Sequence, residues 1–384
     1  MKAIQFSRKP AKLAAAMLAG RLAPGAGAKV GPLTLRDIDP PEPPGPGWLR
    51  VRPRLSGICG SDLATIDGSS SRWFEPIVSF PFTPGHEIVG DLDDDRRAVV
   101  VPVLGCVSRG VDPPCSACTE GRINHCERIA FGDLEPGLQC GFCESTGGGW
   151  STLMVAHQDQ IVPVPDDLSD EGAVLVEPTA CAVHAAAQVD AGRVAVIGAG
   201  TLGLLTIAAL RRAHDGMEIL ATAKHPHQRA LARELGADAA VTPTELDRAV
   251  RTRTGSMRLD NGQITGGIDA VVDCVGSADS IAQALRIAAP GSTIHAVGMP
   301  GVTNVDLTPL WQREVALRGT YAYQRVDFDT AIDLVRDLSL ERLVSATYPL
   351  RDYEDAITHA ATAGVRGAVK IAFDLRSEKE RVSL

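Results

Sequence analysis

A glycine-rich turn near the middle of the chain restricts what the chain can fold into. The β-rich apolar segment that ends at Ile197 runs into a G-x-G-x-x-G turn and then into an apolar, alanine-rich segment that ends at Leu210. A strand, such a turn and a helix, in that order, bind the pyrophosphate of a dinucleotide at the helix N-terminus. The first glycine permits the tight turn, the second lets backbone N–H groups approach the phosphates, and the third lets the helix lie close on the strand. We predict that this turn binds the cofactor through Gly198, Gly200, Thr201, Leu202 and Gly203.

The sequence around this turn alternates between strand-like and helical segments, which is typical of a parallel sheet with crossover helices. The predicted strands are 194–197, 218–222, 239–241, 268–272, 293–297 and 317–321, and the predicted helices are 202–213, 227–235, 244–251 and 280–288. We therefore expect a doubly wound α/β dinucleotide-binding domain of the Rossmann type over residues 189–322.

The chain is too long for a single core, because cores stop growing at about 250 residues and this chain has 384. Residues 1–188 contain strand-like segments such as Lys2–Phe6 and Trp48–Arg52, separated by segments rich in glycine and proline. The last part of the chain, 323–384, predicts helices at 328–338 and about 352–362 and a strand at 368–373. It is too short to be a domain by itself, so we expect it to complete the N-terminal domain.

The composition of the chain limits the kinds of molecule that the protein is expected to bind. The net charge of −9 argues against nucleic acid, because phosphate backbones require a basic surface. We expect no membrane span, since no apolar stretch approaches about 20 residues; 13–19 predicts a short amphipathic or surface helix instead. The nine cysteines are odd in number, and four of them lie between 106 and 126. This distribution favours metal binding in a reducing compartment, so we expect a cytoplasmic protein.

Three residues in separate loops offer the ligands of a catalytic zinc. They are Cys59 in Gly57-Ile58-Cys59-Gly60-Ser61-Asp62, His86 in Gly85-His86-Glu87, and Glu177 in Glu177-Pro178. A thiolate, an imidazole and a carboxylate leave the fourth zinc position open to water or substrate, as a catalytic site requires. Taken singly, a cysteine or a histidine is more often a buried core residue.

Together, these three motifs and the dinucleotide turn resemble the medium-chain, zinc-dependent alcohol and polyol dehydrogenases, a family that includes sorbitol, threonine and glucose dehydrogenases. The resemblance covers Lys2 to Phe373. It implies a GroES-like catalytic β domain, built from both ends of the chain, beside the Rossmann domain. It also implies a zinc ion, NADP or NAD, a small-molecule substrate, and a homodimer or homotetramer.

The resemblance also implies roles for the residues around Cys59 and His86. Asp62 orients His86 from behind, Ser61 relays the substrate proton, and Glu87 is a competing or exchanging metal ligand. Many relatives have cysteine where this chain has Glu177, and the polyol-type members have glutamate. The chain has Ala64 where some alcohol dehydrogenases place a relay histidine, so its outer proton path differs.

A second group of cysteines, Cys106, Cys115, Cys118 and Cys126, predicts a structural zinc site. Four thiolates close a tetrahedron around zinc, and a C-x-x-C pair in a loop rich in proline and glycine is typical of such sites. In the zinc-binding lobe that is usual in the family, the loop that carries these cysteines, the first ligand lies three residues before Cys115. This chain has Asp112 at that position. Either Cys106 is the fourth ligand, which we favour, or Asp112 supplies an oxygen, or the lobe holds no metal. Cys140 and Cys143 are interpreted as free loop cysteines.

The choice of cofactor depends on the end of the second Rossmann strand, where NAD-specific domains place an acidic residue. By alignment to the family, Ala223 occupies that position, with Lys224, His225 and Arg229 nearby. Positive charge there suits a 2′-phosphate, so we predict a preference for NADP.

These predictions describe a zinc-dependent oxidoreductase that transfers a hydride between a nicotinamide and a secondary alcohol or its ketone. The alcohol class is a polyol, sugar, cyclitol or amino-alcohol. Two alternatives are a reductase of the same superfamily that acts on an activated double bond, and a catalytically silent zinc- and nucleotide-binding member. The double-bond reductase should lack Cys59, His86 and Glu177 together, and this chain has all three. The intact ligands and Ser61 argue against the catalytically silent protein.

Overall fold

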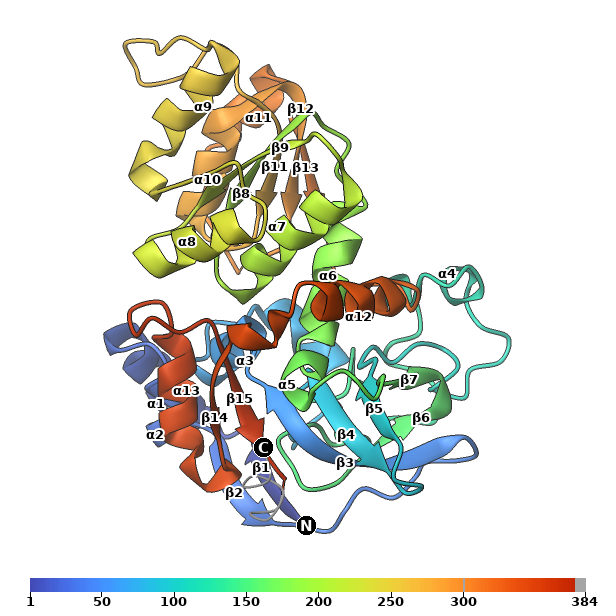
Figure 1. Cartoon of the computed structure of the whole chain (residues 1–384). Helices are drawn as coiled ribbons and strands as arrows, with labels where there is room; N and C mark the ends of the chain where they lie inside the picture. Colours follow the sequence, from blue (N-terminus) through green and yellow to red (C-terminus); the bar gives the residue numbers. More distant parts are fainter. Residues whose placement is uncertain (300, 377–384) are drawn as a thin grey trace. The chain divides into compact units, whose positions relative to one another are not determined.

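The computed structural model describes residues 1–299 and 301–376. They form two compact units, one made of Met1–Glu177 and the segment from Tyr323 onward, the other of Pro178–Ala322. The division after Glu177 falls inside helix α6 (Val176–Ala186), whereas the sequence analysis drew it after residue 188. The chain thus leaves the first unit once and returns to it (Figure 1).

The second unit is built on one parallel sheet, in the strand order β10-β9-β8-β11-β12-β13. Its strands are β8 (Arg193–Ile197), β9 (Glu218–Thr222), β10 (Ala239–Val241), β11 (Ile268–Asp273), β12 (Ala288–Ala296) and β13 (Ala316–Gly319). Its helices are α7 (Thr201–Ala213), α8 (Pro226–Glu234), α9 (Leu246–Thr254), α10 (Ala278–Ile287) and α11 (Thr308–Gln312), with the 3₁₀ turn η4 (Pro243–Glu245) before α9. All six predicted strands are present, within a few residues of their predicted bounds.

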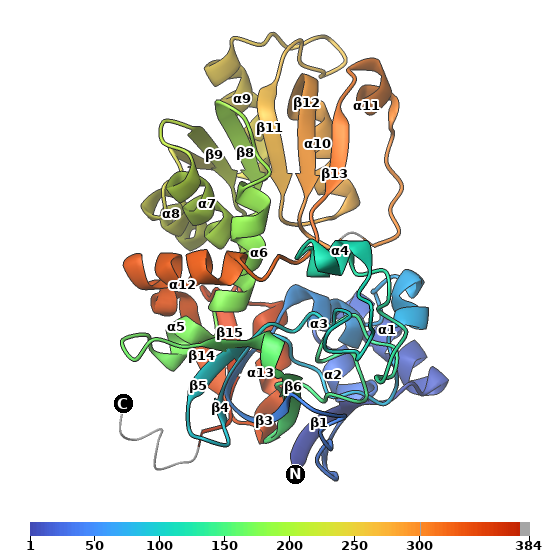
Figure 2. The same cartoon turned by 90° about the vertical axis from the view of Figure 1, so that its right-hand side faces the viewer.

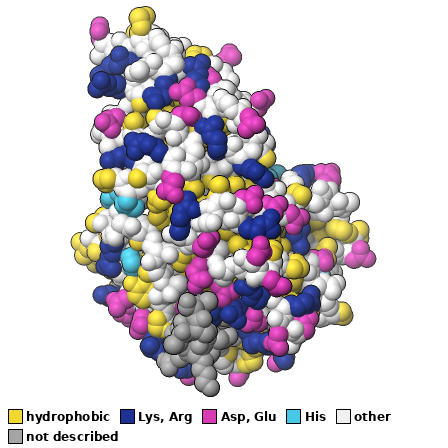
Figure 3. All heavy atoms as spheres, in the orientation of Figure 1, with side chains coloured by type: hydrophobic (Ala, Val, Ile, Leu, Met, Phe, Trp, Pro, Cys, Tyr) yellow, Lys and Arg dark blue, Asp and Glu magenta, His cyan; other side chains and the backbone are white. Residues whose placement is uncertain are grey.

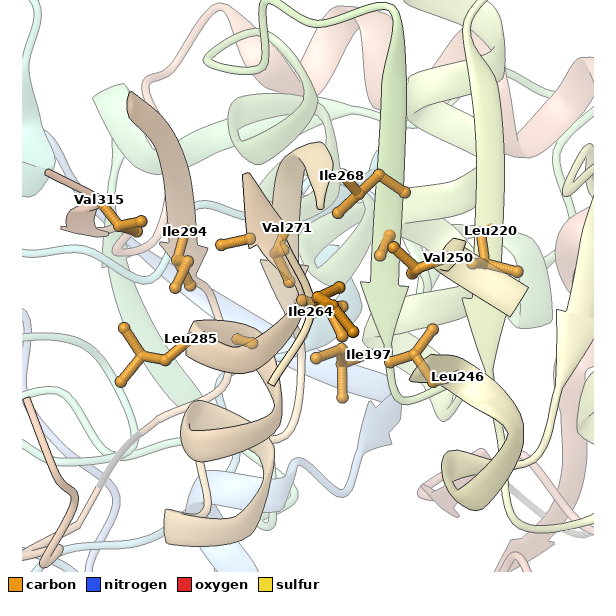
Figure 4. Close-up of a cluster of buried hydrophobic side chains, with 14 of the residues drawn as sticks. Ile197, Leu220, Leu246, Val250, Ile264, Ile268, Val271, Leu285, Ile294 and Val315 are labelled. Carbon is orange, nitrogen blue, oxygen red and sulfur yellow. The ribbon is translucent and has the colours of Figure 1, made fainter. Parts of the chain in front are cut away.

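Helices cover both faces of this sheet because its strands are apolar on both sides. On one face, Ile197, Val271 and Ile294 pack with residues of α9 and α10, among them Leu246 and Leu285 (Figure 4). Side chains alternate along a strand, so Val194 and Val196 of β8 point to the other face, where they are fully buried. A parallel sheet buried on both faces is the expected doubly wound arrangement.

The first unit is organised around a mixed sheet in the order β14-β15-β3-β4-β5-β7, with β6 also paired to β3, and a separate antiparallel pair β1-β2. Its strands are β1 (Lys2–Phe6), β2 (Leu33–Asp37), β3 (Trp48–Gly57), β4 (Ile88–Leu92), β5 (Arg97–Val100), β6 (Met154–His157), β7 (Ile161–Pro163), β14 (Val344–Tyr348) and β15 (Lys370–Asp374). Strand β15 pairs antiparallel with β3, so the end of the chain completes the sheet that the first part begins (Figure 2).

Short helices surround this sheet. They are α1 (Pro10–Leu22), α2 (Gly27–Val30), α3 (Gly60–Ile66), α4 (Ser116–Thr119), α5 (Asp170–Ala173), α12 (Asp327–Asp337) and α13 (Tyr353–Ala361), with 3₁₀ turns η1 (Arg72–Ile77), η2 (Ile123–His125), η3 (Gln158–Gln160), η5 (Leu340–Leu343) and η6 (Leu350–Asp352). The helix predicted at 13–19 is part of α1. Helix α6 begins at Val176 and holds Pro178 in its first turn, where proline is tolerated. Strands β2, β5, β6, β7 and β14 were not predicted.

The segment that carries α1 and α2 is fastened to α3 and to the loop after it. Both carboxylate oxygens of Asp67, which follows α3, accept hydrogen bonds from the backbone N–H groups of Gly25 and Gly27, each at 3.0 Å. Arg8 forms a 3.0 Å ion pair with Glu75 of η1 and lies over the ring of Phe80. The segment before β2 therefore braces the stretch between Cys59 and His86.

A buried charge network joins the end of the chain to this sheet. Asp170, the first residue of α5, is 5% exposed and accepts hydrogen bonds from Arg54 of β3 at 2.9 Å, Arg97 of β5 at 3.0 Å and Arg376 at 3.2 Å. On the surface, by contrast, acidic and basic side chains are mixed, as the face drawn in Figure 3 shows.

Candidate active site and metal centres

Cys59 and His86 come together where β3 ends and β4 begins. Cys59 is the residue before α3, and its backbone N–H donates to the Asp62 carboxylate at 3.0 Å, which caps the helix. His86 lies in the turn directly before β4, a strand that pairs antiparallel with β3. The side chain of Cys59 lies near enough to His86 to help raise the pKa of the imidazole. Ser61 lies in the first turn of α3, two residues after Cys59.

Asp62 faces the other side of the His86 ring. His86 Nδ1 and Asp62 Oδ1 are 3.5 Å apart, and both side chains are nearly inaccessible to solvent. Burial by itself would lower the pKa of His86, but the Asp62 carboxylate and the Cys59 side chain outweigh it, so the pKa lies well above its usual value. A carboxylate behind a histidine is the arrangement that orients a metal-binding imidazole.

Glu177 enters the same buried region from the first turn of α6. The pKa of Glu177 is raised to about 7, mainly because the carboxyl group is buried. The nearby His86 acts in the opposite direction and lowers this pKa. The hydroxyl of Tyr323, whose side chain is fully buried, also acts to lower the pKa of Glu177. A carboxylate taken out of water in this way is stabilised in its charged form by a nearby cation or metal ion.

Glu87 forms a buried ion pair with Lys370, a residue that the sequence analysis missed. Lys370 begins β15 and also donates to the backbone carbonyl of Ile58 at 3.2 Å. Burial would lower the pKa of Lys370, but the Glu87 carboxylate outweighs it and the pKa is raised. A Cβ on Gly57 would collide with the side-chain ends of Glu87 and Lys370, so a larger residue there would displace this ion pair. A lysine inside the apolar run Ala368-Val369-Lys370-Ile371 was the available signal.

The donors in this region fit a zinc ion by their chemistry. They are a thiol, an imidazole with a carboxylate behind it and a buried carboxylate, and His86 Nδ1 and Asp62 Oδ1 are buried without a hydrogen bond of good geometry. The ligand atoms of Cys59, His86 and Glu177 are not all within 4.8 Å of one another; within residues 1–299 and 301–376, only the four lobe cysteines are that close.

The four lobe cysteines form a compact cluster. The Sγ atoms of Cys106, Cys115, Cys118 and Cys126 all lie within 4.8 Å of one another, and those of Cys106 and Cys126 are 3.7 Å apart. Backbone N–H groups point at the sulfurs, including that of Cys115 at Cys106 Sγ at 3.3 Å. Asp112 is exposed and is not a member of this cluster. The fold therefore brings Cys106 to the position where the fourth thiolate of a tetrahedral zinc site belongs.

Replacing Cys106 by serine is expected to remove the lobe metal, whereas Asp112→Asn should leave it in place. The loss of one of four thiolates should weaken zinc binding by at least ~100-fold, more than the loss of a partner behind a ligand does. Zinc content after dialysis against a chelator measures the effect. If Asp112→Asn releases the metal and Cys106→Ser does not, the oxygen-ligand alternative is correct.

Cys140 and Cys143 are free thiols, as interpreted from the sequence, but they are not exposed on a loop. Both are fully buried in the apolar cluster beneath β3 and β4. Burial raises the pKa of Cys140 to about 12 and also raises that of Cys143. Neither is a reactive thiolate at neutral pH.

The dinucleotide turn lies between β8 and α7. Gly198 has a φ of +89°, and a side chain at Gly203 would collide with the carbonyl of Gly198, so both positions require glycine. At Gly200 a Cβ would meet no atom of the chain within 4 Å. Packing therefore does not explain this second glycine, whereas the approach of a ligand to the backbone does. Thr201 and Leu202 begin α7.

The residues predicted to choose the cofactor follow β9. Lys224 is exposed. His225 is the N-cap residue of α8, and its ring stacks on that of His227 with 5.8 Å between the ring centroids. The Arg229 guanidinium donates to the carbonyls of Ala223 and Lys224, at 2.9 and 3.0 Å. Arg229 thus shapes the loop, and Lys224 is the cation best placed to meet a ligand.

Comparison with known proteins adds to this picture. Residues 45–166 match the alcohol dehydrogenase GroES-like domain, and residues 201–337 match the zinc-binding dehydrogenase domain. A sorbitol dehydrogenase of Arabidopsis thaliana is 29% identical over 86% of this chain and 89% of its own length. The chain belongs to the zinc-dependent medium-chain alcohol and polyol dehydrogenase family. The predicted GroES-like and Rossmann-type fold is thereby confirmed.

Two further members of this dehydrogenase family are similar over most of the chain. An L-idonate 5-dehydrogenase of Vitis vinifera is 27% identical over 86% of this chain and 89% of its own length. The solved structure of a zinc-binding dehydrogenase from Sinorhizobium meliloti 1021, bound to NADP, matches with a TM-score of 0.70 and 26% identity, over 89% of this chain and 96% of that one.

Among the described residues, none of the helices is both long and apolar enough to span a membrane.

Proposed function

We propose that this chain is a zinc- and nicotinamide-dependent dehydrogenase that interconverts a secondary alcohol of the polyol or sugar class and its ketone, with NADP preferred. The observation that carries the proposal is the set of half-buried Cys59 and buried His86 and Glu177, backed by Asp62 and by the Glu87–Lys370 pair. A buried carboxylate at the third position supports the polyol class, as do the names of the sorbitol and L-idonate relatives.

Each residue has a part in this proposal. Cys59, His86 and Glu177 would hold the zinc ion, which acts as a Lewis acid on the substrate oxygen when bound, while the nicotinamide accepts the hydride. Asp62 holds the His86 ring in its orientation. Ser61 Oγ accepts the proton that leaves the substrate hydroxyl and passes it outward, since a hydroxyl can accept and donate at once. Lys370 holds Glu87 in an ion pair beside these ligands.

The rest of the proposal concerns the surroundings of the site. We propose that the segment 68–82 contacts the substrate, because it lies between Cys59 and His86 in the sequence and carries the exposed Trp73. The enzyme works as a homodimer or homotetramer in the cytoplasm. Size-exclusion chromatography with light scattering measures the assembly directly.

The function is tested by measuring bound zinc and then screening polyols, sugars and sugar acids for the production of reduced nicotinamide with NADP and with NAD. Turnover should require zinc and return when stripped protein is reloaded. Full zinc occupancy with no turnover of any alcohol or ketone would favour the catalytically silent alternative. Reduction of an activated double bond by zinc-free protein would favour the reductase alternative.

Lys224→Ala is expected to raise the KM for NADP by roughly 10-fold or more and to change the KM for NAD little. A hydrogen bond to a charged group contributes about 1.5–3 kcal/mol, and only NADP carries the 2′-phosphate. Arg229→Ala is the comparison variant. It should weaken both cofactors, because Arg229 holds the loop carbonyls. A higher kcat/KM of the wild type with NAD would contradict the NADP preference.

A further inference from the structure

Arg109 is a buried cation in the zinc lobe. It lies three residues after Cys106 and is inaccessible to solvent. Among the described residues, its guanidinium donates only to backbone carbonyls, at 3.2 Å to Leu104, 3.2 Å to Phe131, 3.4 Å to Leu134 and 3.3 Å to Glu135, and also to Gly137. These bonds tie the segment 131–137 to the turn that carries Cys106.

None of these partners is an anion. Within the part of the chain that the structure describes, no carboxylate forms an ion pair with Arg109. The groups able to carry negative charge that act on it are the thiols of Cys143, which acts most strongly, and then of Cys126, Cys140 and Cys106. A guanidinium stays charged in a protein, and a charge buried without a counter-ion is costly even when carbonyl dipoles surround it.

The two thiols at positions 140 and 143 do not supply this counter-charge. Burial raises the pKa of both, so they are neutral at physiological pH. The four lobe cysteines do supply it once they bind a divalent ion, because zinc takes its cysteine ligands as thiolates. Four thiolates and one Zn²⁺ carry two net negative charges, and Arg109 neutralises one of them.

We infer that Arg109 is the counter-ion of a zinc tetrathiolate at Cys106, Cys115, Cys118 and Cys126, so that the buried guanidinium and the metal site stabilise each other. This inference rests on the proposal that these cysteines hold zinc. The alternative is a purely structural role, in which Arg109 only ties carbonyl groups together and its charge is incidental.

The variants Arg109→Gln and Arg109→Lys separate the two roles, because both lose most of the carbonyl contacts while only lysine keeps the charge. Arg122→Gln, which removes an exposed arginine of the same lobe, is the control. Cobalt(II) loaded in place of zinc reports the lobe by its thiolate charge-transfer absorption, which differs from that of a site with mixed ligands. Competition with a chelator then gives the affinity of the lobe.

We expect Arg109→Gln to weaken the lobe metal roughly 10–100-fold, as loss of a group that supports the ligands does, while Arg109→Lys keeps most of the affinity and Arg122→Gln all of it. Arg109→Gln should also lower the melting temperature of the loaded protein more than that of the stripped protein. Equal losses of metal affinity in the glutamine and lysine variants would overturn the inference, as would equal destabilisation with and without metal. If the glutamine variant does not fold, retention of metal by Arg109→Lys supports the inference and its loss contradicts it.

Failure of the underlying site proposal would look different. In that case the wild type would show no tetrathiolate absorption with cobalt, and the lobe cysteines would react with a thiol reagent whether or not metal had been added. If the wild type binds cobalt as a tetrathiolate and Arg109→Gln binds it with the same affinity, only the role of Arg109 is rejected.

Discussion

Glu177→Gln is expected to lower kcat/KM by roughly 1,000-fold and to release the catalytic zinc. The amide keeps the shape of the side chain but loses the negative charge that would bind the metal. Lewis-acid stabilisation is worth several kcal/mol, and about 4 kcal/mol corresponds to a thousand-fold change in rate. Steady-state kinetics and zinc content measure the two effects.

Glu177→Cys is the matched variant, because it restores an anionic zinc ligand at the same position. It should keep zinc and a larger share of activity than Glu177→Gln. Zinc stoichiometry equal to that of the wild type in Glu177→Gln, together with unchanged turnover, would remove Glu177 from the proposed ligand set. Circular dichroism of both variants shows whether the fold is retained.

Asp170→Asn is expected to destabilise the first unit by about 3 kcal/mol. Among the described residues, Asp170 is the one carboxylate that Arg54, Arg97 and Arg376 share, and it is 5% exposed. Without it, Arg54 keeps Asp91 and Arg376 keeps Asp374 and Glu171, whereas Arg97 keeps only backbone carbonyls. Urea unfolding followed by tryptophan fluorescence measures the effect, because Trp150 is buried in this unit.

Asp93→Asn is the control for this prediction. Asp93 pairs with Arg52 at 3.1 Å, but its side chain is 64% exposed, so its loss should cost at most about 1 kcal/mol. An Asp170→Asn variant that unfolds at the same urea concentration as Asp93→Asn would show that the buried network does not hold the end of the chain to the sheet.

Much of the second unit could be predicted from its sequence. Strands β8 to β11 are short, mostly apolar runs that alternate with helical patterns, so local periodicity was sufficient. Strand β14 was missed because its exposure alternates between half-buried and exposed, and its side chains form no apolar run.

The chemistry of the site was also readable in part. Cysteine, histidine and glutamate in glycine- or proline-containing loops indicated metal ligands, and the C-x-x-C pair indicated the lobe. Lys370 was missed because its partner group on Ile58 is 312 positions away in the sequence, and no local pattern encodes such a contact. The burial of Cys140 and Cys143 was missed for the same reason: a loop pattern does not show what packs on it.

The sequence by itself determined the kinds of group that this protein can use and their order along the chain, because strand, turn and ligand preferences act over a few neighbouring residues. The tertiary structure alone decided which groups meet. It brought Cys106 rather than Asp112 to the other lobe cysteines, placed Lys370 against Glu87, and surrounded Arg109 with carbonyls. These contacts depend on how distant segments pack and on which charges lose their water, and both follow from the folded core.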